Sequence, residues 1–170
     1  MQDLPSDMES LTNLGSTVAA LLTERNETLA IVESSAGGLI NAALVAVPGA
    51  SNYYLGGCIV YTAAGREALL GISPADMQGM RSASEPYAQL LARRVRAKLG
   101  TSWGLAETGA SGPRGNRYGD PAGHACIAVS GPIEAVITIE TGSAEREANM
   151  WVYARRAVEL LESCIRKAGS

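Results

Sequence analysis

Two short segments of the sequence gather the small and polar residues that could do chemistry. One covers residues 33–38 (Glu-Ser-Ser-Ala-Gly-Gly) and the other covers residues 108–116. In the first, Ser34 or the serine after it could act as a nucleophile. The backbone N–H groups of Gly37 and Gly38, at a helix start, could hold a phosphate or an oxyanion. The alternative is that both serines only cap the helix.

Four polar residues outside the first segment are further candidates. Tyr61 ends an expected strand, at the sheet edge where Ser34 is expected, and Arg66 follows five residues later. Their alternatives are a partly buried aromatic residue and a solvated helix face. His124 is either a general base or an ordinary strand residue. Arg146, between two glutamates at a helix start, either binds a ligand phosphate or faces solvent.

The chain has one histidine, and no cluster of cysteines accompanies it. A Ser/His/Asp triad would depend on this one histidine and a zinc site would lack His and Cys ligands, so the sequence predicts neither. We therefore expect chemistry without a metal or another cofactor. The loop at residues 115–121 has turn-forming residues at both ends and is either a lid over the site or an ordinary surface loop.

Apolar periodicity indicates which elements position these residues. Helices alternate with apolar strands, and two strands follow each other directly, so the pattern predicts an α/β protein, a three-layer α/β/α sandwich with a mixed sheet. We expect a single domain over residues 10–170 after a flexible N-terminus at residues 1–9. The expected helices are 11–22, 39–47, 66–70, one capped by Ser84 and one capped by Ser143, and the expected strands are 28–32, 57–62, 103–108, 124–130 and 133–141.

Composition excludes several partner classes. The 170 residues include 14 Lys and Arg against 17 Asp and Glu, a net charge of -3, and a nucleic-acid binder would need clustered cations. Residues 34–65 carry no charge, but their apolar part, residues 39–47, falls short of the roughly 20 residues a membrane span requires. The three cysteines, Cys58, Cys126 and Cys164, lie in apolar stretches, which is typical of reduced thiols in a cytoplasmic protein.

Four segments together resemble a known family, the C-terminal domain of the competence/damage-inducible CinA proteins, which also occurs alone as nicotinamide-nucleotide amidohydrolase. The segments are 33–39, 47–57, 61–71 and 108–113, in the same order and spacing. The resemblance implies an α/β/α fold, usually oligomeric, and metal-independent hydrolysis of nicotinamide mononucleotide, a small nucleotide, to nicotinate mononucleotide and ammonia. It assigns a nucleophile at Ser34, polar site groups at Tyr61 and Thr108, backbone close to substrate at Gly37, Gly38, Gly109 and Gly112, and a phosphate-binding cation at Arg146.

Departures from the family pattern leave the base undetermined. Arg66 stands where the family has a lysine that helps to activate the serine, and a guanidinium cannot act as a general base. Glu107 replaces an apolar residue, and it or His124 is the candidate substitute base. The leading hypothesis is a nicotinamide mononucleotide amidohydrolase in which Arg66 contributes charge and hydrogen bonds. The alternatives are an amidohydrolase of another substrate, a catalytically silent nucleotide-binding homologue and a purely structural protein.

Overall fold

A computed structural model describes residues 10–169, so the expected flexible segment 1–9 lies outside the described residues. Five strands form one mixed sheet in the order β2-β1-β3-β4-β5. β2, β1 and β3 are parallel, whereas β4 runs antiparallel to both β3 and β5. The helices are α1 (Leu11–Arg25), α2 (Leu39–Val45), α3 (Ala63–Leu70), α4 (Glu85–Leu99) and α5 (Arg146–Ala168), and the strands are β1 (Leu29–Glu33), β2 (Tyr54–Ile59), β3 (Trp103–Ala110), β4 (His124–Ser130) and β5 (Ala135–Glu140).

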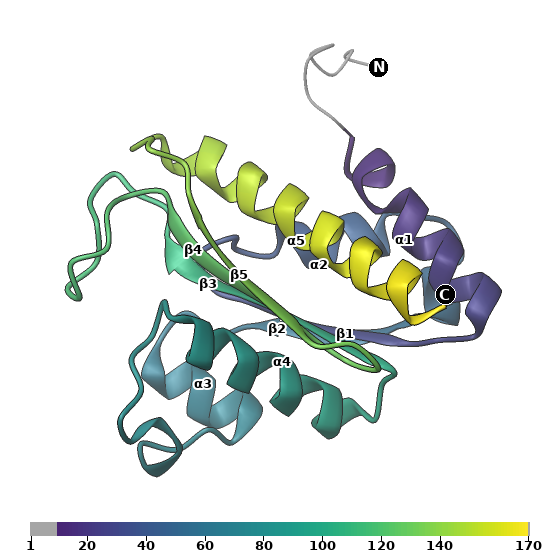
Figure 1. Ribbon diagram of the computed structural model, residues 1–170, viewed down its shortest axis with the longest axis horizontal. Coiled ribbons are helices and arrows are strands. Elements are labelled where there is room, and N and C mark those ends of the chain that lie inside the picture. The colour runs from purple at the N-terminus through teal and green to yellow at the C-terminus, as the bar shows by residue number, and fades with distance from the viewer. Residues whose placement is uncertain (1–9, 170) are drawn as a thin grey trace.

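The sheet is covered on both faces, which confirms the three-layer α/β/α prediction. α1, α2 and α5 lie on one face, and α3 and α4 on the other (Figure 1). Side chains alternate along the buried strand β1, so that Leu29 and Ile31 join the core beneath α1, α2 and α5. Ala30 and Val32 join the second core, against α4. All five residues of β1 are buried, as a strand covered on both faces requires.

Capping residues explain where several helices begin and end. The Ser84 hydroxyl accepts the N–H of Tyr87 and caps α4, as its position predicted, and Gly100 ends that helix with a φ of 65°. The prediction that Ser143 caps the last helix is wrong. α5 starts at Arg146, because the Ser143 hydroxyl instead accepts the N–H of Glu145 in the preceding turn.

The second strand lies earlier in the chain than the predicted 57–62. β2 ends at Ile59, because Thr62 accepts the N–H of Gly65 and caps α3 rather than extending the sheet. The three cysteines are free, with Cys126 and Cys164 buried. Within residues 10–169, no helix is both long enough and apolar enough to cross a membrane.

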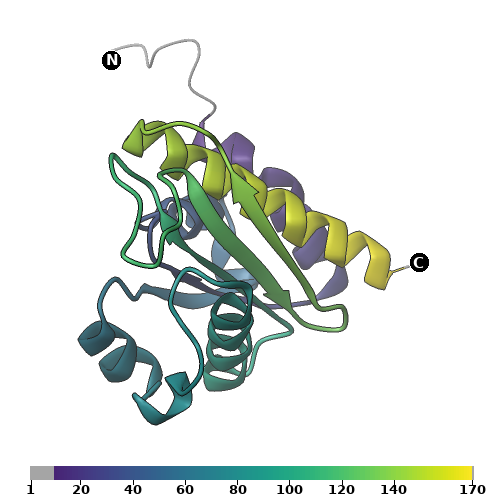
Figure 2. The ribbon, with the colours of Figure 1, turned by 60° about the vertical axis from the view of Figure 1, so that its left-hand side comes forward.

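The carboxyl ends of the three parallel strands meet at one edge of the sheet. The turn after β1, the chain after β2 and the long loop after β3 all leave the sheet there. Both ribbon views place the loop between β3 and β4 beside the N-terminal end of α5 (Figure 2). Ligands of open α/β sheets bind outside the carboxyl ends of strands, so this edge is where a site is expected.

Candidate functional site

A buried carboxylate holds the turn that carries the two serines. Glu107 on β3 is fully buried, and its Oε2 accepts the backbone N–H groups of Ser34 at 3.1 Å and Ala36 at 2.8 Å. Its other oxygen, Oε1, accepts a hydrogen bond from the hydroxyl of Ser35. The conformation of the turn after β1 therefore depends on a side chain more than 70 residues away in the chain.

A second buried carboxylate, that of Glu33, holds the following part of the same turn. It accepts the backbone N–H groups of Gly38 at 2.8 Å and Asn41 at 2.6 Å, and the Asn41 side-chain amide at 2.7 Å. The N–H of Gly37 donates to the carbonyl of Ser34 at 3.2 Å. The N–H groups of both glycines are thus already bonded within the protein, and neither glycine lines the cavity described below. Their φ angles of 69° and 104° explain the residue type instead.

Burial raises the pKa of both carboxyls. For Glu107 desolvation is the largest cause, and it raises the pKa to about 7 against the lowering effect of its three hydrogen bonds, with the charge of Glu33 adding to the rise. Desolvation also raises the pKa of Glu33, against four hydrogen bonds that lower it. Glu107 is consequently a carboxyl that can bind or release a proton near neutral pH.

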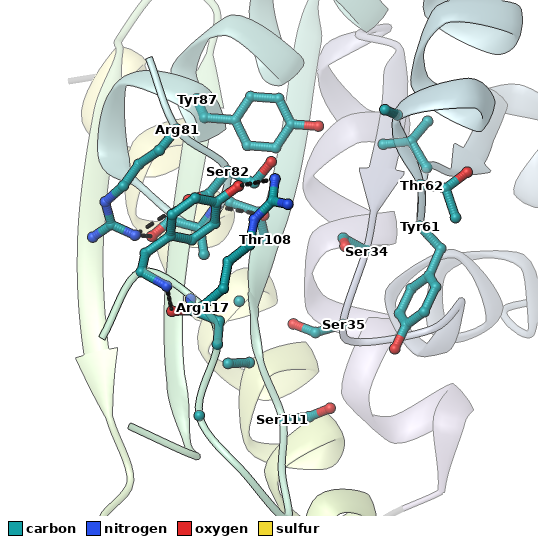
Figure 3. A pocket seen from close by; sticks show the side chains of 18 of the residues that line it. Ser34, Ser35, Tyr61, Thr62, Arg81, Ser82, Tyr87, Thr108, Ser111 and Arg117 are labelled. Atoms are coloured by element: carbon teal, nitrogen blue, oxygen red, sulfur yellow. Dashed lines mark hydrogen bonds between the residues drawn. The ribbon is translucent and has the colours of Figure 1, made fainter. Parts of the chain in front are cut away.

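A cavity of about 670 Å³ opens at the carboxyl ends of the parallel strands. Figure 3 shows Ser34, Ser35 and Tyr61 on one side of it, opposite Arg81 and Arg117. The cavity brings together most of the residues singled out from the sequence, namely Ser34, Tyr61, Arg66, Thr108, Gly109, Gly112 and Arg146.

Arginines dominate the charge of this cavity. No Asp or Glu of the described residues lines it, whereas five arginines do, namely Arg66, Arg81, Arg114, Arg117 and Arg146. Such a lining in a chain of net charge -3 favours an anionic ligand. Two polar atoms at the cavity add to this preference, because Arg66 Nε and Ser111 Oγ are buried without a hydrogen-bond partner.

Two of these arginines are fixed in place by neighbours. Arg146 donates from Nη2 to the Tyr61 hydroxyl at 2.8 Å and from Nη1 to the carbonyl of Gly112 at 2.5 Å. The Arg66 guanidinium lies over the ring of Tyr87, 5.6 Å from its centre. The helix start at Arg146 and the chain after β2 are therefore joined at the mouth of the cavity.

The loop after β3 is fastened rather than loose. Arg81 contacts both carboxylate oxygens of Asp120, at 2.5 and 3.0 Å, and Asn116 donates to the same carboxylate at 2.7 Å. The guanidinium groups of Arg81 and Arg117 lie 5.2 and 5.1 Å from the ring centre of Tyr118. Sequence reasoning missed Arg81, because nothing local connects it to an aspartate 39 residues further on.

His124 is placed away from the serines. It does not line the cavity, its Nδ1 bonds to Glu140 at 2.6 Å, and its Nε2 bonds to the carbonyl of Ala83 at 2.9 Å. With both ring nitrogens engaged elsewhere, the structure does not support its role as a substitute base. Thr108 does line the cavity, and its hydroxyl accepts the N–H of Ala83 at 3.3 Å.

Two glycines of the site are required by close approaches of the backbone. A Cβ on Gly109 would lie 2.3 Å from the carbonyl oxygen of His124 on the neighbouring strand β4. Gly112 has a φ of 117°, and a Cβ there would lie 2.6 Å from the carbonyl oxygen of Ala144. Both positions bring bare backbone to the cavity wall. Within residues 10–169, no group of three or more His, Cys, Asp or Glu side chains is arranged to hold a metal ion.

The fold and the site define a three-layer α/β/α protein with an arginine-lined cavity at the carboxyl ends of its parallel strands. Residues 11–165 match the CinA C-terminal domain, and the chain belongs to this family. A CinA-like protein of Prochlorococcus marinus is 43% identical over 127 residues, which is 75% of this chain and 29% of the relative. A CinA-like protein of Synechocystis is 34% identical over 157 residues, 92% of this chain and 38% of the relative. The chain thus spans about a third of the length of these relatives.

Solved structures share the same fold. A crystal structure of a competence-damaged protein (CinA) superfamily protein from Escherichia coli is similar with a TM-score of 0.83 and 24% identity, covering 96% of this chain and 94% of that one. The competence damage-inducible protein A of Klebsiella pneumoniae gives a TM-score of 0.86 at 23% identity, covering 93% and 98%. At these identities the likeness concerns the fold, with its mixed five-stranded sheet.

Proposed function

We propose that this chain hydrolyses the carboxamide of nicotinamide mononucleotide, releasing nicotinate mononucleotide and ammonia. The observation that carries the proposal is the cavity itself, which is lined by the two serines of the turn after β1 and by five arginines, and by no carboxylate of the described residues. An amide substrate needs an activated hydroxyl, and its phosphate needs cations. The cavity offers both within about 670 Å³, a volume within the usual range of small-molecule sites.

In this proposal some cavity residues bind the phosphate of the substrate and others act on its carboxamide. Arg146 holds the phosphate, with the buried hydroxyl of Ser111 as a second hydrogen-bond donor. Arg66 takes the place of a lysine by supplying positive charge at the cavity, which favours the negative charge that develops on the amide oxygen. A hydroxyl of the serine turn attacks the carboxamide carbon, and no cofactor takes part.

The direct test is turnover of nicotinamide mononucleotide by the purified chain. We expect ammonia and nicotinate mononucleotide in equal amounts, and loss of both in a double variant with Ser34→Ala and Ser35→Ala. Ser16→Ala is the matched control, because Ser16 is an exposed serine on α1. If the parent protein releases neither product at every pH tested between 5 and 9, the proposal is refuted.

A catalytically silent nucleotide-binding protein is the second candidate, and the arginine at position 66 favours it because a guanidinium cannot take up the serine proton. A thermal-shift measurement with nicotinamide mononucleotide separates this candidate from a purely structural protein. Ligand at 100 times its Kd stabilises the folded state by about 2.7 kcal/mol. Stabilisation without turnover would support silent binding. A cytoplasmic location, expected from the three free thiols, completes the proposal.

A further inference from the structure

The two serines of the turn differ in what their hydroxyls contact. Ser35 Oγ donates to Oε1 of Glu107, whereas the hydroxyl of Ser34 makes no hydrogen bond within residues 10–169. Only the backbone N–H of Ser34 contacts Glu107. Both residues line the cavity, and Ser35 is 5% exposed. Of the two candidate nucleophiles, Ser35 alone therefore has a proton acceptor in contact.

Other side chains at the site do not offer a base. The guanidinium of Arg66 offers hydrogen-bond donors and has no atom that accepts a proton. His124 lies outside the cavity with both ring nitrogens bonded elsewhere. The carboxylate of Glu33 contacts Gly38 and Asn41 but no hydroxyl.

We propose that Ser35 is the nucleophile of this site and that the buried carboxylate of Glu107 is its general base. The proposal deepens the amide hydrolysis proposed above and rests on it for the identity of the substrate. It differs from the assignment that the family resemblance implies, in which Ser34 is the nucleophile.

The two oxygens of Glu107 have separate tasks. Oε2 is anchored by the N–H groups of Ser34 and Ala36, and neither amide can release its proton to a carboxylate. Oε1 is left to accept from the Ser35 hydroxyl, which can release its proton to the carboxylate. The anchoring fixes the base against the nucleophile before substrate binds, and the pKa of about 7 suits a base that works near neutral pH. The titratable groups facing Glu107 are Glu33 from β1 and Tyr153 from α5.

The reaction that follows is balanced. As the bond between Ser35 Oγ and the carboxamide carbon forms, the hydroxyl proton moves to Glu107 Oε1. The C–N bond then breaks, and the same proton leaves with the nitrogen as ammonia. Water attacks the resulting ester and gives a proton to Glu107, and that proton returns to Ser35 Oγ as the carboxylic acid product departs.

A serine-directed reagent tests this pair without relying on the substrate. Diisopropyl fluorophosphate forms an O–P bond with an activated serine while the P–F bond breaks, fluoride leaves and the serine proton passes to the base. We expect peptide mass spectrometry to find the label on Ser35 in the parent and in Ser34→Ala. The labelling rate should rise about tenfold between about pH 6 and pH 8, as a base with a pKa of about 7 loses its proton.

Glu107→Gln should lower labelling at pH 8 by at least about 100-fold, the smaller end of what a general base contributes. Its matched control is Glu33→Gln, which also changes a buried carboxylate beneath the turn but one that contacts no hydroxyl, so labelling should remain pH-dependent. If Glu107→Gln does not fold, the labelled residue and the pH profile of the parent decide.

Label on Ser34, no label on either serine, or a rate independent of pH would each overturn the pair. Turnover of nicotinamide mononucleotide is measured on the same samples, so the two proposals fail separately. Label on Ser35 without turnover would retain the pair and refute only the substrate. Turnover that survives Ser35→Ala would retain the substrate and refute the pair.

Discussion

Glu107 makes folding stability depend on pH in a predictable direction. Its carboxyl has a pKa of about 7 in the folded chain against an ordinary value of 4.5, because burial disfavours the charged form. Between these two values the unfolded chain has released the proton and the folded chain still holds it. The stabilisation that the neutral Glu107 carboxyl contributes is therefore fully present below about pH 4.5 and is lost as the pH rises through about 7. Each pH unit in this window is worth about 1.4 kcal/mol, so the whole loss is about 3 kcal/mol.

Glu107→Gln isolates this contribution, because glutamine keeps the size and the acceptor oxygen but cannot ionise. We expect the free energy of unfolding of the parent, relative to the variant, to fall by about 3 kcal/mol from about pH 4.5 to pH 8. The assay is urea unfolding of both proteins at several pH values, followed by circular dichroism. A difference between the two proteins that stays constant over that range would refute the assignment of a neutral buried carboxyl.

Three further predictions concern the phosphate contact, the turn and self-association. Arg146→Ala should raise the KM for nicotinamide mononucleotide in steady-state kinetics about 10- to 100-fold, because a charged hydrogen bond to the phosphate is lost. Arg156→Ala, on the exposed side of α5, is the control and should leave KM unchanged. Equal KM values for the parent and Arg146→Ala would refute the phosphate contact. Gly38→Ala should destabilise the chain by about 1–3 kcal/mol in urea unfolding because its φ is 104°, while Gly65→Ala, at an ordinary helical φ, should not destabilise it. Leu55, 47% exposed on the edge strand β2, leads us to expect a homo-oligomer in analytical ultracentrifugation that Leu55→Asp dissociates, and a monomeric parent would contradict this.

The layers of the fold were predictable because their signals are local. Apolar spacing marked the helices, short apolar runs marked the strands, and the position of Ser84 before a proline marked the start of α4. The second strand was predicted too far along the chain, at residues 57–62, because the β-branched residues there are typical of a strand although Thr62 caps the next helix. Local signals determine which elements exist better than where they end.

The site was only partly predictable because its key contacts are long-range. Gly37 and Gly38 carry the composition of an anion-binding turn, yet the Gly38 N–H donates to Glu33 inside the protein. Composition does not reveal where an N–H points. Glu107 was visible as an unusual residue type, but its contact with Ser35 depends on β1 and β3 being neighbours.

The pairing of β1 with β3 also places two carboxyls under one turn, so that the charge of one affects the pKa of the other. Glu33 is the last residue of β1 and Glu107 lies within β3, and each is one residue beyond the pair Val32 and Ala106. The negative charge of Glu33 raises the pKa of Glu107, after desolvation and against the hydrogen bonds. Glu33→Gln removes that charge, so the pH midpoint of Ser35 labelling should move down. A midpoint that moves up would mean that Glu33 stays neutral and influences Glu107 only through the shape of the turn.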